Sequence, residues 1–422
     1  MKHFLKSIVA SLLAILARAI IRKYQPTIVM VTGSVGKTST KDAVAAALSG
    51  KFLLRASEKS YNSEFGVPLT IIGAKNPWEN PSAWMGVFQE ALALIVLPNL
   101  YPRLLVLEVG ADRPGDLKRI LSIAIPDAVV VTKLPEIPVH VEAYASPSAV
   151  REEEFLPALA LAAGAPLIIS ADDKYAQIMA GRLTANVITV GYGSDALMRI
   201  ENPHFNGTDM EATLVDCDAH RTIRVKGSLG RPQLYAPAMA YALASALHLK
   251  PEEILTNLEG YLPPPGRARI LRGIRGSILI DDSYNASPTA VEEALSGMQL
   301  VPGSRRIVAL GDMLELGRYS MKEHERIGAL VASSADMIVT VGARSRDALE
   351  AAREHGLTHE ATLGFESSLE AGHALAELVK EGDVVLIKGS QSMRMERIVE
   401  VLLADPADAR LLVRQDTEWK RR

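Results

Sequence analysis

The chain of 422 residues has a single cysteine, Cys217, and few aromatic residues. One thiol excludes an internal disulfide framework and any metal site built from several cysteines, and it fits a reducing compartment, which predicts a cytoplasmic protein. Basic residues are not in excess either, because the formal net charge at pH 7 is −3. Domains that bind nucleic acid usually carry a basic face, so the composition predicts no nucleic-acid partner.

The chain also lacks a long uncharged apolar run. Its most apolar segment, residues 4–21, is interrupted by Lys6 and Arg18, whereas a helix that spans a bilayer needs about 20 apolar residues. No small-residue cleavage site precedes Arg22, which argues against a signal peptide. Packing on the protein fits this segment best, peripheral contact with the inner face of a membrane fits nearly as well, and a true span fits least.

What is present is typical of a large folded protein with two or three domains. From Thr27 onward, short β-branched runs alternate with helical patterns, which predicts an α/β fold with a mostly parallel sheet. Strands are predicted at residues 27–31, 104–109, 127–132, 166–170 and 186–190. Alternating patterns at residues 212–215 and 222–225 predict a small antiparallel side sheet, and a helix is predicted at residues 236–247.

Three prolines and a glycine at residues 263–266 cannot continue a helix or a central strand, so they mark the preferred domain boundary. Beyond them, strands predicted at residues 277–281, 306–310, 337–341 and 383–387 indicate a C-terminal Rossmann-like α/β domain. The predicted organisation is an apolar helix at 1–26, a central domain at 27–262, a C-terminal domain at 263–409 and a polar tail at 410–422.

The strongest local signal is the sequence GSVGKTS at residues 33–39, which follows an apolar strand and precedes a helix. Glycines let the backbone approach phosphate oxygens, N–H groups at the helix start point at the anion, and Lys37 and Thr38 suit a phosphate and a magnesium ion. The loop is shorter than the general P-loop, because Val31 stands where that pattern has its first glycine. The alternative is a turn that binds nothing, but the Lys-Thr pair favours a P-loop ATPase domain.

Two further residues follow predicted strands of the central domain. Glu108 ends one strand, at the carboxyl edge where doubly wound sheets place their ligands, and its carboxylate suits magnesium. A salt bridge at a strand end is the alternative. His140 follows the strand that ends at Thr132, and taken alone it fits a structural or surface histidine better than a ligand.

The loop at residues 281–288 of the second domain carries two acids, a tyrosine and an amide, which suits contact with a ribose or a phosphate. Ser287 and Pro288 also fit a helix N-cap and first helical position, a role compatible with binding. Arg267 and Lys388 are isolated cations that each fit solvated surface charge when taken alone.

Together these residues resemble a known family, the Mur ligases, over nearly the whole chain from residue 27 to 403. The resemblance rests on the order and spacing of eight segments: GSVGKTSTK (33–41), YNSEFGVPLT (61–70), EVGA (108–111), VHVE (139–142), GR (266–267), DDSYNASP (281–288), GDMLELG (311–317) and KGSQSMRME (388–396).

The resemblance implies an ATP- and Mg²⁺-dependent ligase that activates a carboxylate as an acyl phosphate and joins it to an amine. It implies that Lys37, Glu108, His140 and Arg267 serve catalysis. The residues expected to bind the nucleotide are Gly33, Ser34, Val35, Gly36, Lys37, Thr38, Ser39, Arg267, Asp282, Tyr284 and Asn285. Thr38, Glu108 and His140 are expected to hold magnesium, and Asn62, Ser63, Lys388 and Ser390 are expected to face the substrates.

Three departures from the family pattern stand out. The family's N-terminal domain for a UDP-linked substrate has no counterpart in the 26 residues before the first strand. Glu154 stands where relatives have a carbamylated lysine, so its carboxylate is a candidate magnesium ligand, although three adjacent acids also fit a solvated helix face. Pro232 and Gln233 replace a His-Asn pair near the adenine.

The function expected from the resemblance is peptide ligation in peptidoglycan precursor synthesis, with a muramyl-peptide acyl substrate and an amino donor such as D-Ala-D-Ala. A Mur-like ligase that acts on a lipid-linked or other acceptor is the first alternative, and a non-catalytic nucleotide-binding protein is the second. A monomer is expected.

Overall fold

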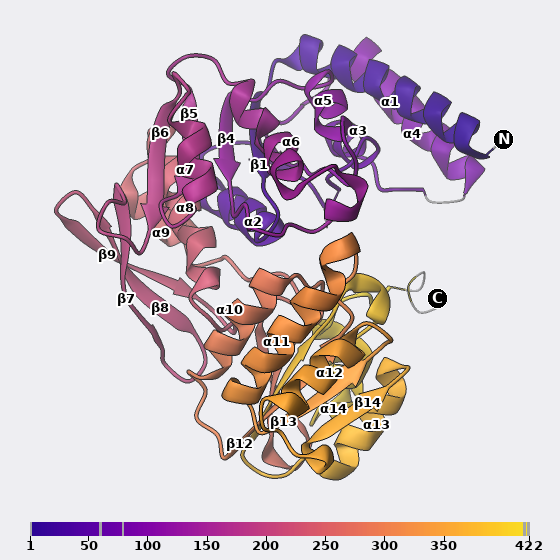
Figure 1. Cartoon of the computed structure of the whole chain (residues 1–422). Helices are drawn as coiled ribbons and strands as arrows, with labels where there is room; N and C mark the ends of the chain where they lie inside the picture. Colours follow the sequence, from indigo (N-terminus) through magenta and orange to yellow (C-terminus); the bar gives the residue numbers. More distant parts are fainter. Residues whose placement is uncertain (1, 59–60, 78–79, 417–418, 420–422) are drawn as a thin grey trace.

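The computed structural model describes residues 2–58, 61–77, 80–416 and 419. Two α/β domains lie one above the other in Figure 1, each with helices on both faces of its sheet. The upper domain holds a nine-stranded sheet with the strand order β2-β3-β1-β4-β5-β6-β7-β8-β9, and the lower holds a six-stranded sheet with the order β10-β11-β15-β12-β13-β14. The first sheet therefore precedes the predicted proline linker in the sequence, and the second sheet follows it.

The parallel part of the first sheet is built from β-branched runs that are buried on both faces. Its strands are β1 (Thr27–Thr32), β2 (Leu54–Ala56), β3 (Leu104–Glu108), β4 (Ala128–Val131), β5 (Pro166–Ser170) and β6 (Asn186–Gly191). Alternation along β1 sends Val29 and Val31 into one hydrophobic core and Ile28 and Met30 into the other. The five strands predicted here are confirmed, and β2 is an additional short edge strand.

The helices of the central domain form a layer on each face of this sheet. The layer that shares a core with Val29 and Val31 comprises α2 (Lys37–Ala47), α8 (Pro232–Ala246) and α9 (Pro251–Leu258). The other layer comprises α1 (Lys2–Tyr24), α3 (Gly66–Ile72), α4 (Pro81–Val96), α5 (Asp116–Leu121), α6 (Pro147–Leu159) and α7 (Lys174–Ala180). The apolar N-terminal segment thus packs on the protein, with Leu13, Ala17 and Ile20 buried. Among the described residues, no helix combines the length and apolarity that crossing a bilayer requires.

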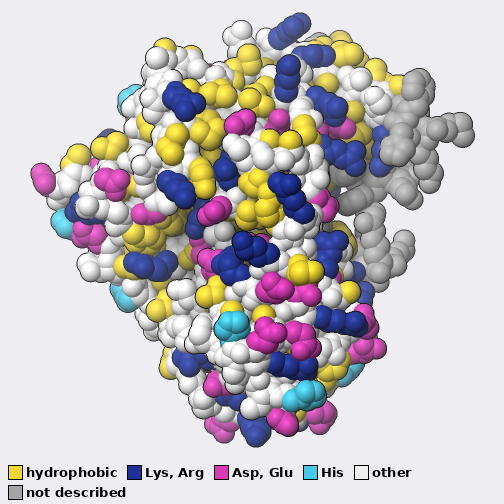
Figure 2. Space-filling model, viewed as in Figure 1, with side chains coloured by type: hydrophobic (Ala, Val, Ile, Leu, Met, Phe, Trp, Pro, Cys, Tyr) yellow, Lys and Arg dark blue, Asp and Glu magenta, His cyan; other side chains and the backbone are white. Residues whose placement is uncertain are grey.

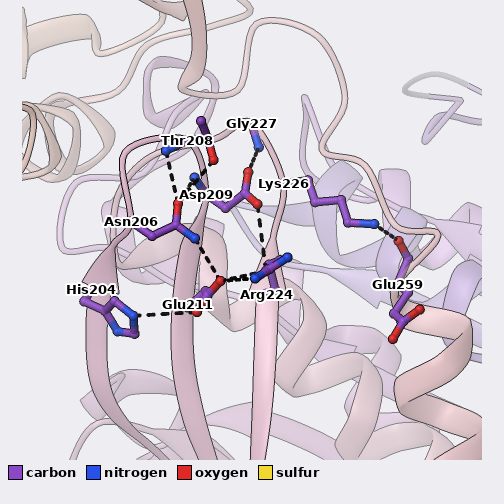
Figure 3. Close-up of polar contacts among 9 residues, drawn as sticks. All are labelled: His204, Asn206, Thr208, Asp209, Glu211, Arg224, Lys226, Gly227 and Glu259. Atoms are coloured by element: carbon purple, nitrogen blue, oxygen red, sulfur yellow. Dashed lines mark hydrogen bonds and ion pairs between the residues drawn. The ribbon is translucent and has the colours of Figure 1, made fainter.

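The antiparallel strands continue the same sheet, because β7 (Met198–Phe205) pairs with β6 and carries β8 (Met210–Asp216) and β9 (Ala219–Val225). Figure 3 shows how the β7–β8 turn is fixed: the Asn206 side chain accepts hydrogen bonds from the Thr208 and Asp209 backbone N–H groups. Asp209 in turn accepts from the Gly227 N–H at 2.9 Å, and Lys226 donates to the Glu259 carbonyl at 2.6 Å. These contacts tie the hairpin to the chain that leads into the second domain.

The second sheet consists of β10 (Arg269–Arg272), β11 (Ile278–Asp282), β12 (Arg305–Gly311), β13 (Met337–Val341), β14 (Thr362–Phe365) and β15 (Asp383–Lys388). Helices α10 (Pro288–Met298), α11 (Ser320–Ser334) and α12 (Ser345–Glu354) cover one face, and α13 (Ser368–Leu378) and α14 (Glu396–Leu402) cover the other. All strands are parallel except β10, which pairs antiparallel with β11. The four predicted strands are confirmed, while β10 and β14 are short strands that the sequence pattern did not indicate.

The stretch assigned to a polar tail returns to the C-terminal domain. Leu412 and Val413 are buried, and the Arg414 guanidinium donates to the Glu396 carboxylate at 2.7 Å and to the Ser283 carbonyl at 3.3 Å. A buried arginine is stabilised only when such partners surround it. Arg414 therefore supports the 281–288 loop.

Candidate active site

The carboxyl ends of six strands, three from each sheet, meet across a cleft between the domains. In the first sheet β3 and β4 flank β1, which leads directly into the glycine loop. In the second sheet β11 and β12 flank β15, so that Asp282 and Lys388 are register partners at the edge. Side chains more than 100 residues apart in sequence therefore line one cleft, in the position where open α/β sheets bind ligands.

The glycine loop depends on two residues with positive φ. Gly33 has φ 115° and Gly36 has φ 88°, a region that favours glycine. A Cβ on Gly33 would also lie only 2.4 Å from the Thr132 hydroxyl oxygen. Helix α2 begins immediately after Gly36, so its N–H groups face the cleft as a phosphate site requires. The Lys37 amino group donates to the Gly33 carbonyl and therefore lies over the loop.

Glu108 is buried beside this loop, and one of its oxygens has no partner. Its Oε1 lies 3.2 Å from the Thr38 hydroxyl, whereas its Oε2 makes no hydrogen bond to any described residue. Burial raises the pKa of Glu108, and the positive charges of Lys41 and Lys37 oppose this rise. A buried carboxylate oxygen without a donor is costly, so the arrangement suits a cation supplied from the cleft.

Glu154 contacts the glycine loop directly from α6. Its Oε2 accepts a hydrogen bond from the Ser34 hydroxyl at 2.5 Å, and its Oε1 lies 3.9 Å from the Lys37 amino nitrogen. The residue is 2% exposed, which excludes for Glu154 the solvated helix face considered for the three adjacent acids. Burial raises the pKa of Glu154, and the Lys37 charge and the Ser34 hydrogen bond counteract it.

The neighbouring acids of α6 have other roles. Glu153 accepts from the Gly115 and Leu117 N–H groups at the start of α5, and Glu152 is exposed. Only Glu154 of the three reaches the cleft.

His140 lines the cleft but is held by acids on both sides of it. Its Nδ1 lies 2.9 Å from the Glu315 carboxylate of the C-terminal domain, and its Nε2 lies 3.5 Å from Asp112. Burial lowers the pKa of His140, but the hydrogen bond and charge of Glu315 outweigh that effect, so the net shift is upward. The sequence motif 311–317 contained Glu315, yet nothing in the sequence indicated that it would contact His140.

The C-terminal domain contributes two paired cations. The Arg267 guanidinium lies 4.2 Å from the centre of the Tyr284 ring, and both residues line the cleft. Lys388 is 2% exposed, and its amino group donates to Asp282 at 2.7 Å and to the Asn285 carbonyl at 3.0 Å. Lys388 is thus a buried cross-link of the 281–288 loop, in which Ser287 caps α10 as predicted.

The residues expected to face the substrates are divided. Asn62 and Ser390 line the cleft. A Cβ at Gly110 would lie only 3.1 Å from the Asn62 amide nitrogen, so the glycine leaves room for the Asn62 side chain. The Ser390 hydroxyl accepts from the Leu314 N–H at 2.9 Å. Ser63 is not part of the cleft lining; its hydroxyl accepts from the Gly66 N–H at the start of α3.

Two adjoining cavities make up the cleft. The larger has a volume of about 530 Å³ and is lined by the glycine loop, Glu108, His140, Glu154 and residues 284–287. The smaller, of about 120 Å³, lies behind the loop and is bounded by Ser39, Gln233, Tyr235 and Met239. Tyr235 donates to Asp172 there, and an ion pair of Lys133 with Glu293 joins the domains beside it. The Tyr235–Asp172 contact lies within the central domain, whereas the Lys133–Glu293 pair depends on how the two domains meet, which the sequence does not indicate.

The candidate metal ligands do not form a complete coordination shell. Within the described ranges, no three His, Cys, Asp or Glu side chains lie close enough together to hold a metal ion among themselves. Magnesium commonly takes one or two carboxylates and keeps several waters, so Thr38 and the unpaired oxygen of Glu108 fit its needs.

Comparisons with known proteins agree with this architecture. The family described as "Mur ligase, glutamate ligase domain" matches residues 266–391. A UDP-N-acetylmuramoyl-tripeptide–D-alanyl-D-alanine ligase of Bacillus subtilis is 25% identical over 93% of this chain and 79% of that protein, and its counterpart from Mycobacterium leprae is 29% identical over 90% and 74%. The crystal structure of MurF ligase from Thermotoga maritima in complex with ADP covers 93% of this chain and 83% of that chain, with a TM-score of 0.78 and 25% identity. Over 93% of its length the chain is therefore similar in sequence and fold to Mur ligases, which are carbon–nitrogen ligases.

Proposed function

We propose that the chain is an ATP-dependent amide ligase that adds D-Ala-D-Ala, or a closely similar amino donor, to a muramyl-peptide carboxylate in peptidoglycan precursor synthesis. The observation that carries the proposal is the meeting of the glycine loop and Glu108 of one domain with Arg267 and the 281–288 loop of the other across one cleft. The relatives named above are ligases of this kind. The cytoplasmic location and the monomeric state stay predictions.

ATP would bind with its phosphates on the glycine loop. The N–H groups at the start of α2 and the Lys37 ammonium are placed for phosphate oxygens, and Lys37 would exchange the Gly33 carbonyl for them. The nucleoside would enter the smaller cavity, which opens beside Ser39 and runs to Tyr235. Arg267, stacked on Tyr284, faces both cavities and would neutralise the phosphate chain from the opposite domain.

Magnesium would be held by Thr38 and Glu108, with His140 and Glu154 acting through bound water. When bound, the ion would neutralise phosphate charge and orient the terminal phosphate. Glu154 needs no carbamylation to present a carboxylate at this place. Its short contact with Ser34 and its proximity to Lys37 link the expected metal site to the loop itself.

The reaction needs alignment more than covalent help. A substrate carboxylate would attack the γ-phosphate, forming an acyl phosphate and ADP, and the amine would then displace inorganic phosphate to leave the amide. Lys37 and Arg267 would stabilise the charge that develops on the transferred group. Asn62 would face the acyl substrate and Ser390 the incoming amine, beside the loop that the buried Lys388 holds in place.

A second candidate keeps this chemistry but changes the acceptor to a lipid-linked muramyl peptide. The observation that favours it is the exposed apolar surface of α1 and α4, with basic residues on α1, on the same domain as Asn62.

The test is ADP release by the full chain with UDP-linked and lipid-linked muramyl peptides, each with and without D-Ala-D-Ala. We expect release that needs both the muramyl peptide and the dipeptide, together with formation of the ligated product. Lys37→Ala should reduce turnover at least 100-fold, because one preorganised charge on a developing oxyanion is worth about that factor. ADP release that ignores both substrates would overturn the proposal, and release with the lipid-linked substrate alone would select the second candidate.

A further inference from the structure

Helices α1 and α4 form one outer surface of the central domain, on the side away from the C-terminal domain in Figure 1. The Lys23 amino group of α1 donates to the carbonyls of Leu94, Ile95 and Leu97 at the end of α4, at 2.6 to 3.0 Å. Tyr24 donates to the Leu94 carbonyl as well. These bonds satisfy carbonyls at a helix end and fix α1 to α4.

This surface exposes large apolar side chains in two helical stripes. On α1, Ile8, Leu12 and Ile15 are 41%, 45% and 54% exposed, and their spacing places them on one face, opposite the buried Leu13 and Ala17. The second stripe runs along α4 and the turn after it, through Met85, Leu92, Val96, Leu97 and Leu100. We call these eight residues the apolar face. Elsewhere in the described ranges, exposed large apolar residues occur singly along the chain.

The charge on α1 has one sign, whereas α4 carries a single exposed acid, Glu90, and no Lys or Arg. Helix α1 contains no Asp or Glu, and Lys6, Arg18 and Arg22 extend from it, of which Lys6 and Arg22 are exposed. Figure 2 shows Lys and Arg side chains next to hydrophobic atoms along this upper edge of the molecule. An apolar stripe flanked by cations is the pattern of helices that lie in the interface of an anionic bilayer. Two copies of the face would oppose their basic helices to each other, which disfavours a dimer through this surface.

We propose that the apolar face docks on the surface of a membrane that contains anionic lipid, with α1 and α4 in the interface plane and Arg18 and Arg22 on lipid phosphates. Helix α3 lies beneath α1 and begins four residues after Asn62, which lines the cleft. The docked surface is therefore connected to the cleft by a short stretch of chain, from Asn62 to the start of α3. The membrane contact does not require the ligase activity, although its use for lipid-linked substrates rests on the proposed function.

The experiment is co-sedimentation of the full chain with phosphatidylcholine vesicles that contain either 30% or no phosphatidylglycerol. We expect binding to the anionic vesicles that weakens at 0.5 M NaCl, because salt screens the charge contribution. Leu12→Gln combined with Val96→Gln should lower the partition coefficient at least tenfold, and so should Arg18→Gln combined with Arg22→Gln. Ile178→Gln, at a side chain that is 59% exposed on α7, is the matched control and should bind as wild type.

Thermal unfolding of each variant verifies that it folds. We expect little change in stability, because the altered apolar side chains are exposed. Absence of wild-type binding to anionic vesicles, or unchanged binding of the Leu12→Gln/Val96→Gln variant, overturns the proposal. So does a concentration-dependent dimer in sedimentation velocity that this variant abolishes, because a second copy would then cover the face. Lys37→Ala should bind vesicles like wild type, so a failed ligase assay and a failed membrane assay remain distinguishable.

Discussion

The Glu154 carboxylate accepts a hydrogen bond from the Ser34 hydroxyl, joining helix α6 to the glycine loop over 120 residues of sequence. The same carboxylate lies 3.9 Å from Lys37, the cation expected to bind phosphate. The glycine loop and α6 are therefore directly linked, and a change in the charge of Glu154 should alter the affinity of the loop for its ligand.

Replacing Glu154 with Gln keeps the size of the side chain but removes its charge. We expect turnover to fall at least tenfold and the magnesium concentration for half-maximal rate to rise, since partners of metal ligands typically affect affinity by about 10 to 100-fold. ADP release measured across a magnesium titration checks this. Glu152→Gln, on the exposed side of the same helix, is the control and should change neither value. Unchanged magnesium dependence in Glu154→Gln would refute the role.

The ion pair of His140 with Glu315 bridges the domains over the cleft, so it should favour the closed arrangement. A double-mutant cycle with His140→Gln and Glu315→Gln compares kcat/KM for ATP among the four proteins. We expect these values to give a coupling free energy of about 0.5 kcal/mol, because both side chains are partly exposed to water. Asp112→Asn removes the longer contact and should have a smaller effect. Strict additivity of the two substitutions would show that the pair does not contribute.

The buried pair of Lys388 with Asp282 should matter for the stability of the second domain. Lys388→Met leaves the Asp282 carboxylate buried without its cation, and removing one partner of such a pair typically costs about 3 kcal/mol. Urea unfolding measures the loss, and Lys380→Met at an exposed position is the control. Lys388→Met combined with Asp282→Asn should recover part of the loss, whereas a cost below about 1 kcal/mol would contradict a buried pair.

Asp281 gives the stability a specific pH dependence. Burial raises the pKa of Asp281 from 3.8 to about 6, and its Oδ2 makes no hydrogen bond to a described residue. The folded state therefore holds this proton more tightly than the unfolded chain. Protonation of Asp281 therefore contributes to the free energy of unfolding. This contribution is complete below pH 3.8 and is lost as the pH rises through about 6.

The free energy of unfolding of wild type minus that of Asp281→Asn should consequently increase as the pH falls from about 6, by up to about 1.4 kcal/mol per pH unit. Urea unfolding at several pH values between 4 and 7 measures the difference. Glu381→Gln, at an exposed position of the same domain, should show no such trend. A flat difference for Asp281→Asn would exclude the raised pKa.

The sequence by itself determined the features whose causes are local. The glycine loop could be identified because Gly33 and Gly36 need positive φ and are followed at once by Lys37 and a helix. The predicted strands were recognisable because β-branched runs buried on both faces are continuous in sequence. The cap of α10 by Ser287 followed from neighbouring residues, and the order of motifs along the chain was sufficient to indicate the family.

The tertiary structure alone decided which distant residues meet. His140 and Glu315 lie in different domains, and no sequence pattern indicates how far apart they are. The sequence left Glu154 between a ligand and a solvated helix face, and only the packing of α6 against the glycine loop buries it. The sequence alone is compatible with Lys388 as a surface charge, but the strand order places Lys388 beside Asp282. Contacts of this kind depend on strand order and domain closure, which nonlocal packing determines and a local pattern cannot encode.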